Sequence, residues 1–348
     1  MTNPTLAAAR RHTPPISCAV LCAVLCATLA ACGGGGDEPV ATDAQTTAAR
    51  VDPLAAKRSG QVKPPAPGAD TGGHVLELGT TIAGFPHKVD VYRPAGATRA
   101  IVFLHGNGGT SGSLAYTLGF SRSGFPSNRS VNWEWLSQNG VIAVLPQGQA
   151  APGTNLRTWS NYITQSGQDD VAFLTALASN VKSRYGMADV SLAGYSAGGG
   201  MTARVWCEAG GAYKAFVSVS GPMMSGNGRG VTCTPAVPAP YFVLLGDKDL
   251  VLPGYNPNLP APTPEQSAAG LTGGYLVAEW TRHGDRSRTV CSETTALSGA
   301  DLSAAGNTWN NCADRIRYMV VKNADHYIPS FEAALGGKLV DTIAGFVN

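Results

Sequence analysis

Short apolar runs alternate with longer stretches of mixed polarity along most of the chain. Each run is five or six residues long, and residues that favour turns, such as Gly, Pro and Asn, lie near its ends. Runs of this kind are typical of strands buried on both faces, as in a parallel sheet that helices cover on either side. We therefore predict strands at residues 88–92, 100–104, 141–145, 190–194, 215–220, 241–246 and 316–321.

Helical patterns occupy segments between these runs. In residues 169–186 apolar side chains recur at helical spacing, and Asp169 or Asp170 stands at the start, where a carboxylate suits the helix dipole. Residues 331–347 predict one C-terminal helix. Strands that alternate with helices form a doubly wound α/β domain with a mostly parallel sheet, which we place at residues 74–348. The apolar face of the helix in 169–186 consists of Val171, Leu174, Ala178, Val181 and Tyr185.

The first 31 residues have the pattern of a signal peptide. Arg10 and Arg11 precede an apolar run that is too short and too weakly flanked to span a membrane. The run ends in Leu-Ala-Ala-Cys, which resembles a bacterial lipobox and implies a lipid on Cys32. Ordinary signal cleavage, which would release a freely secreted protein, is the alternative. Residues 32–73, rich in Gly, Pro, Ala and Thr, are expected to form a flexible tether.

Composition is that of a globular protein with few charges. Of the 348 residues, 44% are hydrophobic and 14% are charged, so the chain can bury a sizeable core. The formal net charge of +2 is spread without basic runs, which argues against nucleic acid and against an anionic membrane surface as partners. A lipid at Cys32 is then the one membrane contact that we expect.

The cysteines favour an exported, disulfide-bonded domain. Of eight cysteines, three lie in the signal peptide and Cys32 is the predicted lipidation site. The other four are an even number in a chain that we expect to be exported, which favours two disulfides. Proximity along the chain favours Cys207 with Cys233 and Cys291 with Cys312, and free buried thiols are the alternative. No pair has C-x-x-C spacing, so we predict no metal site.

The strongest chemical signal is the sequence Gly194-Tyr195-Ser196-Ala197-Gly198. It follows a predicted strand and leads into a helical pattern. A serine at such a sharp turn has an exposed hydroxyl, and the flanking glycines let neighbouring segments approach closely. We therefore predict Ser196 as a nucleophile and the Ala197 N–H as one donor to an oxyanion. A simple glycine-rich turn is the alternative interpretation.

A second glycine-rich loop, His105-Gly106-Asn107-Gly108-Gly109, follows the strand at 100–104. In nucleophile-elbow hydrolases the second oxyanion donor comes from a loop at this point, and its glycines leave the backbone open to a carbonyl oxygen. We assign that donor to the Asn107 N–H. His105 precedes the nucleophile, against the chain order Ser, Asp, His, so we interpret it as a loop-packing residue.

An acid and a base follow the nucleophile in the expected order. Asp249 lies just past the strand at 241–246, followed by an apolar pair and a proline, and Asp247 is the alternative. His326 follows the strand at 316–321 and is the predicted base. His283, the other later histidine, lies in the charged stretch TRHGDRSR, which predicts a solvated surface. The acid should be buried against the histidine, where it holds the base's tautomer.

Together these segments resemble the esterase family of polyhydroxybutyrate depolymerases and feruloyl esterases. The resemblance spans about residues 100–329 and rests on HGNGG, QDDVAFLTAL, SLAGYSAGGGMTARVWC, GDKD and NADHYIP. It implies a single domain of the α/β-hydrolase fold, with catalytic roles for Ser196, Asp249 and His326. Members often carry Cys where this chain has Asn107, and a Cys shortly before the tryptophan that matches Trp159.

The function that we predict is ester hydrolysis outside the cytoplasm through an acyl-enzyme, without a cofactor. The first choice of substrate is a polyhydroxybutyrate-type polyester or its oligomers, and the second is a feruloyl or acetyl ester of plant polysaccharide. A serine peptidase and a non-catalytic binding lipoprotein are the rival classes. Residues 253–272 are either a lid or a surface loop. Five tryptophans are candidates for an acyl pocket or for the core, namely Trp133, Trp135, Trp159, Trp280 and Trp309.

Overall fold

A computed structural model describes residues 72–222, 233, 235–255 and 257–348. The predicted signal peptide, Cys32 and all but the last two residues of the predicted tether lie outside the described residues. None of the helices in the described part is both long enough and apolar enough to cross a bilayer.

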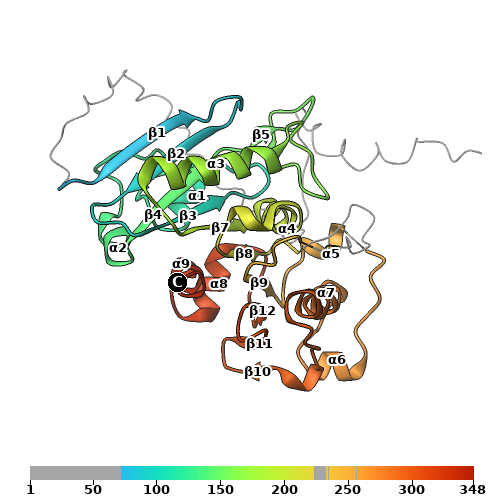
Figure 1. Cartoon of the computed structure of the whole chain (residues 1–348). Helices are drawn as coiled ribbons and strands as arrows, with labels where there is room; N and C mark the ends of the chain where they lie inside the picture. The colour runs from blue at the N-terminus through green and yellow to red at the C-terminus, as the bar shows by residue number, and fades with distance from the viewer. Residues whose placement is uncertain (1–71, 223–232, 234, 256) are drawn as a thin grey trace, which may run out of the picture. The chain divides into compact units, whose positions relative to one another are not determined.

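The described residues form a ten-stranded sheet whose centre is parallel (Figure 1). Six adjacent strands, β4-β3-β7-β8-β9-β12, run parallel, and the strands beyond them at both edges are antiparallel. The order is β1 (Val75–Thr81), β2 (Lys88–Arg93), β4 (Val141–Pro146), β3 (Arg99–Leu104), β7 (Val190–Tyr195), β8 (Phe216–Val219), β9 (Tyr241–Gly246), β12 (Ile316–Val321), β11 (Gly306–Asn311) and β10 (Asp301–Leu302). A separate small sheet pairs β5 (Gln149–Ala150) with β6 (Arg157–Thr158).

Helices cover both faces of this sheet, and each face has its own hydrophobic core. One core packs strand side chains against α3 (Asp170–Tyr185), α4 (Ala197–Ala209) and α7 (Gly274–Cys291). The other packs them against α1 (Ser111–Thr117), α2 (Trp133–Gln138), α8 (Ile328–Leu335) and α9 (Leu339–Phe346). Every residue of β4 and β9 is buried, as two covered faces require. The predicted doubly wound α/β architecture is confirmed.

Helix α3 forms where the sequence pattern places it. Asp169 caps its N-terminus, where the side chain accepts a hydrogen bond from the Ala172 N–H at 3.0 Å. Gly186, with φ of 66°, ends it in the left-handed conformation that glycine adopts readily. Of the predicted apolar face, Leu174, Ala178 and Val181 are buried, and Val171 and Tyr185 are half-buried. Phe173 and Leu177, which the prediction omitted, are buried as well.

Two predictions about helices are wrong. The C-terminal segment forms two helices, α8 and α9, because Gly336 adopts φ of 68° and ends the first. His283 is not on a solvated surface: it lies in α7 and is fully buried. The charged neighbours Arg282 and Arg286 are buried too, because each pairs with buried Glu279, at 3.2 and 2.7 Å.

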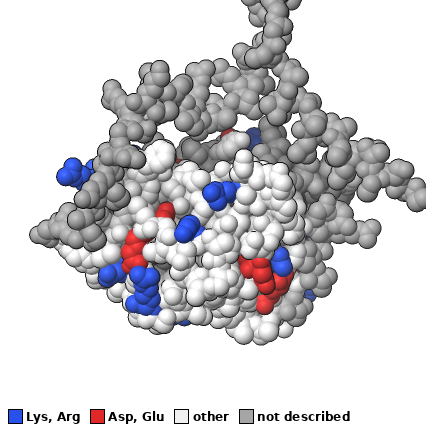
Figure 2. Space-filling view, turned by 90° about the horizontal axis from the view of Figure 1, so that it is seen from above, with Lys and Arg blue, Asp and Glu red and all other residues white. Residues whose placement is uncertain are grey.

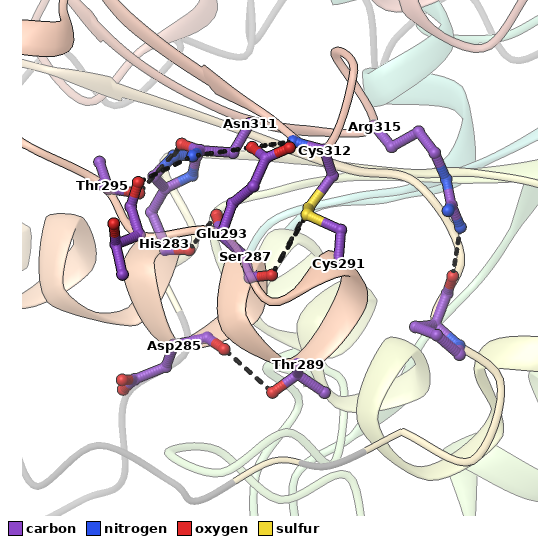
Figure 3. The surroundings of a disulfide bond; sticks show 12 residues. His283, Asp285, Ser287, Thr289, Cys291, Glu293, Thr295, Asn311, Cys312 and Arg315 are labelled. Atoms are coloured by element: carbon purple, nitrogen blue, oxygen red, sulfur yellow. Dashed lines mark hydrogen bonds between the residues drawn. A yellow bond between two sulfur atoms is a disulfide. The ribbon is translucent and has the colours of Figure 1, made fainter.

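Two disulfides join the predicted pairs, Cys207 with Cys233 and Cys291 with Cys312. Figure 3 shows the second, which links the end of α7 to the turn after β11; there the Glu293 carboxylate accepts a hydrogen bond from the Cys312 N–H at 2.7 Å. Cys291, Glu293 and Cys312 lie close enough to suggest metal ligands, but both sulfurs are consumed by the disulfide. Two disulfides in one domain suggest an oxidising, extracytoplasmic compartment.

Charged side chains are sparse on the face drawn in Figure 2. Lysine and arginine lie interspersed with aspartate and glutamate on a largely uncharged surface. Surface pairs such as Lys214 with Asp189 and Arg184 with Glu77 join opposite charges at 2.6 Å. The electrostatic potential of this face is therefore mixed in sign, and the face does not attract an ionic partner strongly over a long range.

Candidate active site

Ser196 stands at the sharp turn between β7 and α4. Its backbone has φ of 55° and ψ of −120°, a conformation that a non-glycine residue rarely adopts. The turn is held because the Ser196 N–H donates to Val219 O at 2.8 Å, in the neighbouring strand β8. Glycines make it possible: a Cβ added at Gly194 would lie 2.1 Å from Gly198 O, and one added at Gly198 would lie 2.4 Å from Leu104 O.

The three residues predicted as nucleophile, base and acid meet at one hydrogen-bonded site. The His326 Nε2 atom lies 2.9 Å from Ser196 Oγ, and His326 Nδ1 lies 2.7 Å from Asp249 Oδ2. Both partners of the second pair are almost fully buried. Because Asp249 accepts the proton of Nδ1, the tautomer with a free Nε2 lone pair is favoured, and this lone pair faces the serine hydroxyl.

The backbone fixes the Asp249 carboxylate. Its Oδ1 accepts hydrogen bonds from the N–H groups of Val251 and Leu252 at 2.8 and 2.9 Å, which leaves Oδ2 for His326. Asp247, the alternative acid, instead accepts a hydrogen bond from the Asn323 N–H at 2.7 Å. Two carboxylates thus follow β9, and the turn geometry directs Asp249 toward the histidine.

The loop that carries His326 lies directly against the end of β9. A Cβ added at Gly246 would be 2.3 Å from Ala324 O, so a glycine is needed there. Asp325 stabilises the loop by accepting from the Tyr327 N–H at 2.8 Å and the Ser330 hydroxyl at 2.6 Å. These contacts hold His326 beside Asp249, which lies 77 positions away in sequence.

The glycine-rich loop after β3 lies beside Ser196. A Cβ added at Gly106 would be 3.1 Å from Ser196 Cβ and from the Tyr195 ring. Ala197 is the first residue of α4, where backbone N–H groups have no acceptor within the helix. Gly106, the residue before Asn107, and Ala197, the residue after Ser196, thus lie beside Ser196 on two separate segments.

His105 holds this loop in place through hydrogen bonds of both ring nitrogens. It is buried, its Nδ1 donates to Gly106 O at 2.8 Å, and its Nε2 accepts from the Gly148 N–H at 2.9 Å. Burial lowers the pKa of His105 to about 4, so its ring stays neutral near pH 7. The structure places it in the packing of the loop, as the sequence order predicts.

A pocket opens beside Ser196 and His326. None of the five candidate tryptophans lines the described part of it; Trp159 and Trp309 are buried in the core. The predicted lid segment contributes Tyr255 from the short helix α5 (Leu252–Tyr255), and a further short helix, α6 (Pro264–Ala268), forms within it. The described lining comprises Asn161, Ile163, Thr164, Ser196, Ala197, Gly200, Ser220, Gly221, Pro222, Leu252, Tyr255 and His326.

Several of these wall residues were not anticipated from the sequence. Asn161, Ile163 and Thr164 lie in the segment between β6 and α3, and Leu252 opens α5. No spacing rule marks them, because a pocket wall is assembled from residues that are distant in sequence. Only Asn161 carries a local signal, since an asparagine after a strand end often bonds to the backbone two residues on.

The domain that contains this site matches a known protein family. A family model described as the alpha/beta hydrolase family matches residues 101–345. The chain belongs to this family. The match includes the residues of the hydrogen-bonded site, from the loop after β3 to the loop that carries His326.

Solved structures agree with this fold. The chain is similar to acetyl xylan esterase from Aspergillus awamori, with a TM-score of 0.51 and 14% identity over 78% of this chain and 98% of that one. A dienelactone hydrolase from Anabaena variabilis gives a TM-score of 0.41 at 14% identity, over 78% and 95% of the two chains. The likeness to the acetyl xylan esterase shows a shared fold alone. A search of curated protein sequences finds no match.

Proposed function

We propose that this protein is a serine esterase that works through an acyl-enzyme. The hydrogen-bonded line from Asp249 through His326 to Ser196, at 2.7 and 2.9 Å, is the observation that carries the proposal. In the first half-reaction Ser196 Oγ bonds to the ester carbonyl carbon while its proton passes to His326 Nε2. The alcohol then leaves with that proton, and the acyl group stays on the serine.

The second half-reaction repeats these transfers with water. A water molecule gives a proton to His326 Nε2 as its oxygen attacks the acyl carbon, and Ser196 recovers the proton when the acid departs. In both halves negative charge develops on the carbonyl oxygen. We assign its stabilisation to the backbone N–H groups of Asn107 and Ala197, the two donors next to Ser196 on separate segments.

The substrate that we put first is a polyhydroxybutyrate-type polyester or its oligomers. The resemblance of the HGNGG, GYSAG and NADHYIP segments to depolymerases supports this choice. Feruloyl or acetyl esters of plant polysaccharide come second, and the shared fold with an acetyl xylan esterase keeps acetyl esters among the candidates. We further propose export by the N-terminal signal and anchoring through a lipid on Cys32.

A panel of esters tests the reaction and its substrate together. It contains p-nitrophenyl esters, 3-hydroxybutyrate oligomers, amorphous polyhydroxybutyrate, methyl ferulate and acetylated xylan, each assayed with the wild-type protein and with Ser196→Ala. We expect hydrolysis that the variant loses by several orders of magnitude. A folded wild-type protein that cleaves no ester and does not react with a fluorophosphonate would point to a binding lipoprotein. Cleavage of peptides but not of esters would point to a peptidase.

A further inference from the structure

Residues 157–161 run between the two segments that carry Asn107 and Ala197. At one end, Arg157 O accepts a hydrogen bond from the Gly108 N–H at 2.7 Å. Two residues on, the Trp159 Nε1–H donates to His105 O at 2.9 Å from a fully buried side chain. The loop that supplies one proposed oxyanion donor is therefore tied to this segment on both sides of Asn107.

Asn161 ties the same segment to the nucleophile turn. Its Nδ2 donates to Ala197 O at 3.0 Å, on the residue that supplies the other proposed donor. Its Oδ1 accepts from the N–H groups of Ile163 and Thr164, both at 2.7 Å, and the residue is 4% exposed. The Asn161 side chain packs closely on α4, because a Cβ added at Gly200 would lie 3.2 Å from Nδ2.

The segment has its own supports in the two neighbouring helices. The Asp170 Oδ2 atom, at the start of α3, accepts from the Ser160 N–H at 2.5 Å and from the Ser166 hydroxyl at 2.6 Å. Arg204, in α4, donates from Nη1 to Ser160 O at 2.6 Å. Both backbone groups of Ser160 are thus held, and the whole segment is fixed relative to α3 and α4.

We infer that residues 157–161 form a brace that sets the distance between the two oxyanion donors, with Asn161 and Trp159 as positioning residues. The inference rests on the proposed serine esterase function. The two donors belong to separate segments, and the brace is hydrogen-bonded to both, on the residues that flank or carry the donors. Loss of either side-chain bond lets one donor shift relative to the other.

The effect of such a shift falls on the transition state. Donors stabilise an oxyanion only when they lie within hydrogen-bond distance of the position that it will occupy, and a misplacement of about 1 Å can cost roughly a hundredfold in rate. The neutral carbonyl oxygen of the ground-state ester accepts weaker hydrogen bonds from the same donors. The brace should therefore act on kcat and leave KM nearly unchanged.

Asn161→Asp and Trp159→Phe test the two contacts in the full chain. The aspartate keeps an acceptor for the Ile163 and Thr164 N–H groups but has no N–H for Ala197 O. The phenylalanine keeps an aromatic ring in the core, loses the donor to His105 O and adds no charge. For each variant we expect kcat to fall roughly ten- to a hundredfold with KM changed less than threefold. The affinity for a trifluoromethyl ketone, whose adduct with a serine carries an oxyanion, should fall by the same factor as kcat.

Gln168→Ala is the control, because Gln168 is exposed and lies outside the brace, between Asn161 and α3. Circular dichroism and thermal unfolding check that each variant is folded. Full kcat and full ketone affinity in both Asn161→Asp and Trp159→Phe would overturn the brace, and so would a fall in kcat without weaker ketone binding. An inactive wild type whose Ser196 ignores a fluorophosphonate would instead overturn the proposed esterase function, which is a separate outcome.

Discussion

Ser196 has an unfavourable backbone conformation that its neighbours maintain. A non-glycine residue in such a conformation costs on the order of 1–3 kcal/mol, and here the surrounding hydrogen bonds outweigh that cost. The Ser196 N–H bonds to Val219 O, and Ser196 O accepts from the Gly200 N–H at 3.0 Å. The same conformation brings the Ser196 hydroxyl to 2.9 Å from His326 Nε2.

Two substitutions of Ser196 should differ in stability. Ser196→Ala keeps a Cβ in the strained conformation, whereas Ser196→Gly removes it. We expect the glycine variant to be the more stable by about 1 kcal/mol, or roughly 2–4 °C in Tm for a domain of this size. Thermal unfolding of the two purified proteins measures the difference, and equal Tm values would show that the turn is not strained.

His283 illustrates a different effect of burial. Its Nε2 donates to Asn311 Oδ1 at 2.8 Å, and the nearby Arg286 cation disfavours a second positive charge. Desolvation, with that cation as a lesser cause, lowers the pKa of His283 to about 4 from its usual 6.5. Between these values the unfolded chain binds a proton at this ring and the folded chain does not.

Acid should therefore weaken the fold through His283. The contribution is fully present above pH 6.5 and is lost as pH falls toward 4, on the order of 3 kcal/mol over that range. His105 behaves in the same way, so in His283→Gln we expect a shallower loss of unfolding free energy between pH 6.5 and 4, not a flat profile. Urea unfolding at several pH values measures it; identical slopes in variant and wild type would contradict the assignment.

At the scale of elements, Gly336 decides where the chain turns between α8 and α9. Its φ of 68° suits glycine, whereas the next residue, Gly337, has no positive φ and no atom within 4 Å of an added Cβ. We expect Gly336→Ala to lower the unfolding free energy by about 1 kcal/mol and Gly337→Ala to be close to neutral. Denaturant unfolding of the two variants compares neighbouring positions of the same loop. A larger loss at Gly337 would contradict the role given to Gly336.

Continuous apolar runs made the inner strands predictable. All seven predicted strands form, because residues such as those of β4 and β9 are buried on both faces and leave no polar alternation. Three strands of the ten-stranded sheet escaped prediction, as did the two-residue strands β5 and β6. Residues of β1 are half-buried or exposed, β11 is the polar sequence GNTWNN, and β10 has only two residues, so none of them has an apolar run to mark it.

Charged helices were harder to predict than strands. The stretch TRHGDRSR in α7 predicted a solvated surface because it is rich in charge, but its Arg282 and Arg286 both pair with Glu279 inside the protein. A single sequence does not show that partnership, which depends on the spacing of 279, 282 and 286 on a buried helical face. The same limit explains the omitted Asn161, whose partner is a backbone carbonyl 36 positions away.

The residues of the candidate site were easier to predict, because their positions follow from the order of elements. Parallel strands bring their carboxyl ends to one edge, so polar residues after β7, β9 and β12 meet there wherever they lie in the sequence. The sequence favoured Asp249 over Asp247 only through the apolar pair and proline that follow it, and the structure shows that the Asp249 carboxylate is the one that faces His326. Roles for these residues await the ester panel.

For the molecule as a whole, the proposed lipid on Cys32 decides where the protein resides. If Cys32 carries a lipid, Cys32→Ser should move the protein from the membrane fraction to the soluble fraction, with esterase activity per molecule unchanged. Fractionation of a bacterial host that processes lipoproteins, with labelled palmitate, measures both. Cys26→Ser, within the signal peptide, is the matched control and should stay in the membrane fraction. Wild-type protein in the culture medium would favour ordinary secretion.

Residues of the pocket wall can be substituted more freely than the glycines around Ser196. Ile163, Leu252 and Tyr255 come from segments that connect strands, whereas Gly194 and Gly198 leave no space for any side chain at the nucleophile turn. Of these wall residues, Leu252 also donates its N–H to Asp249, whereas Ile163 and Tyr255 make no hydrogen bond to Ser196, Asp249 or His326 through their side chains. We expect a directed-evolution library confined to Ile163 and Tyr255 to change acyl preference while the geometry around Ser196 is kept.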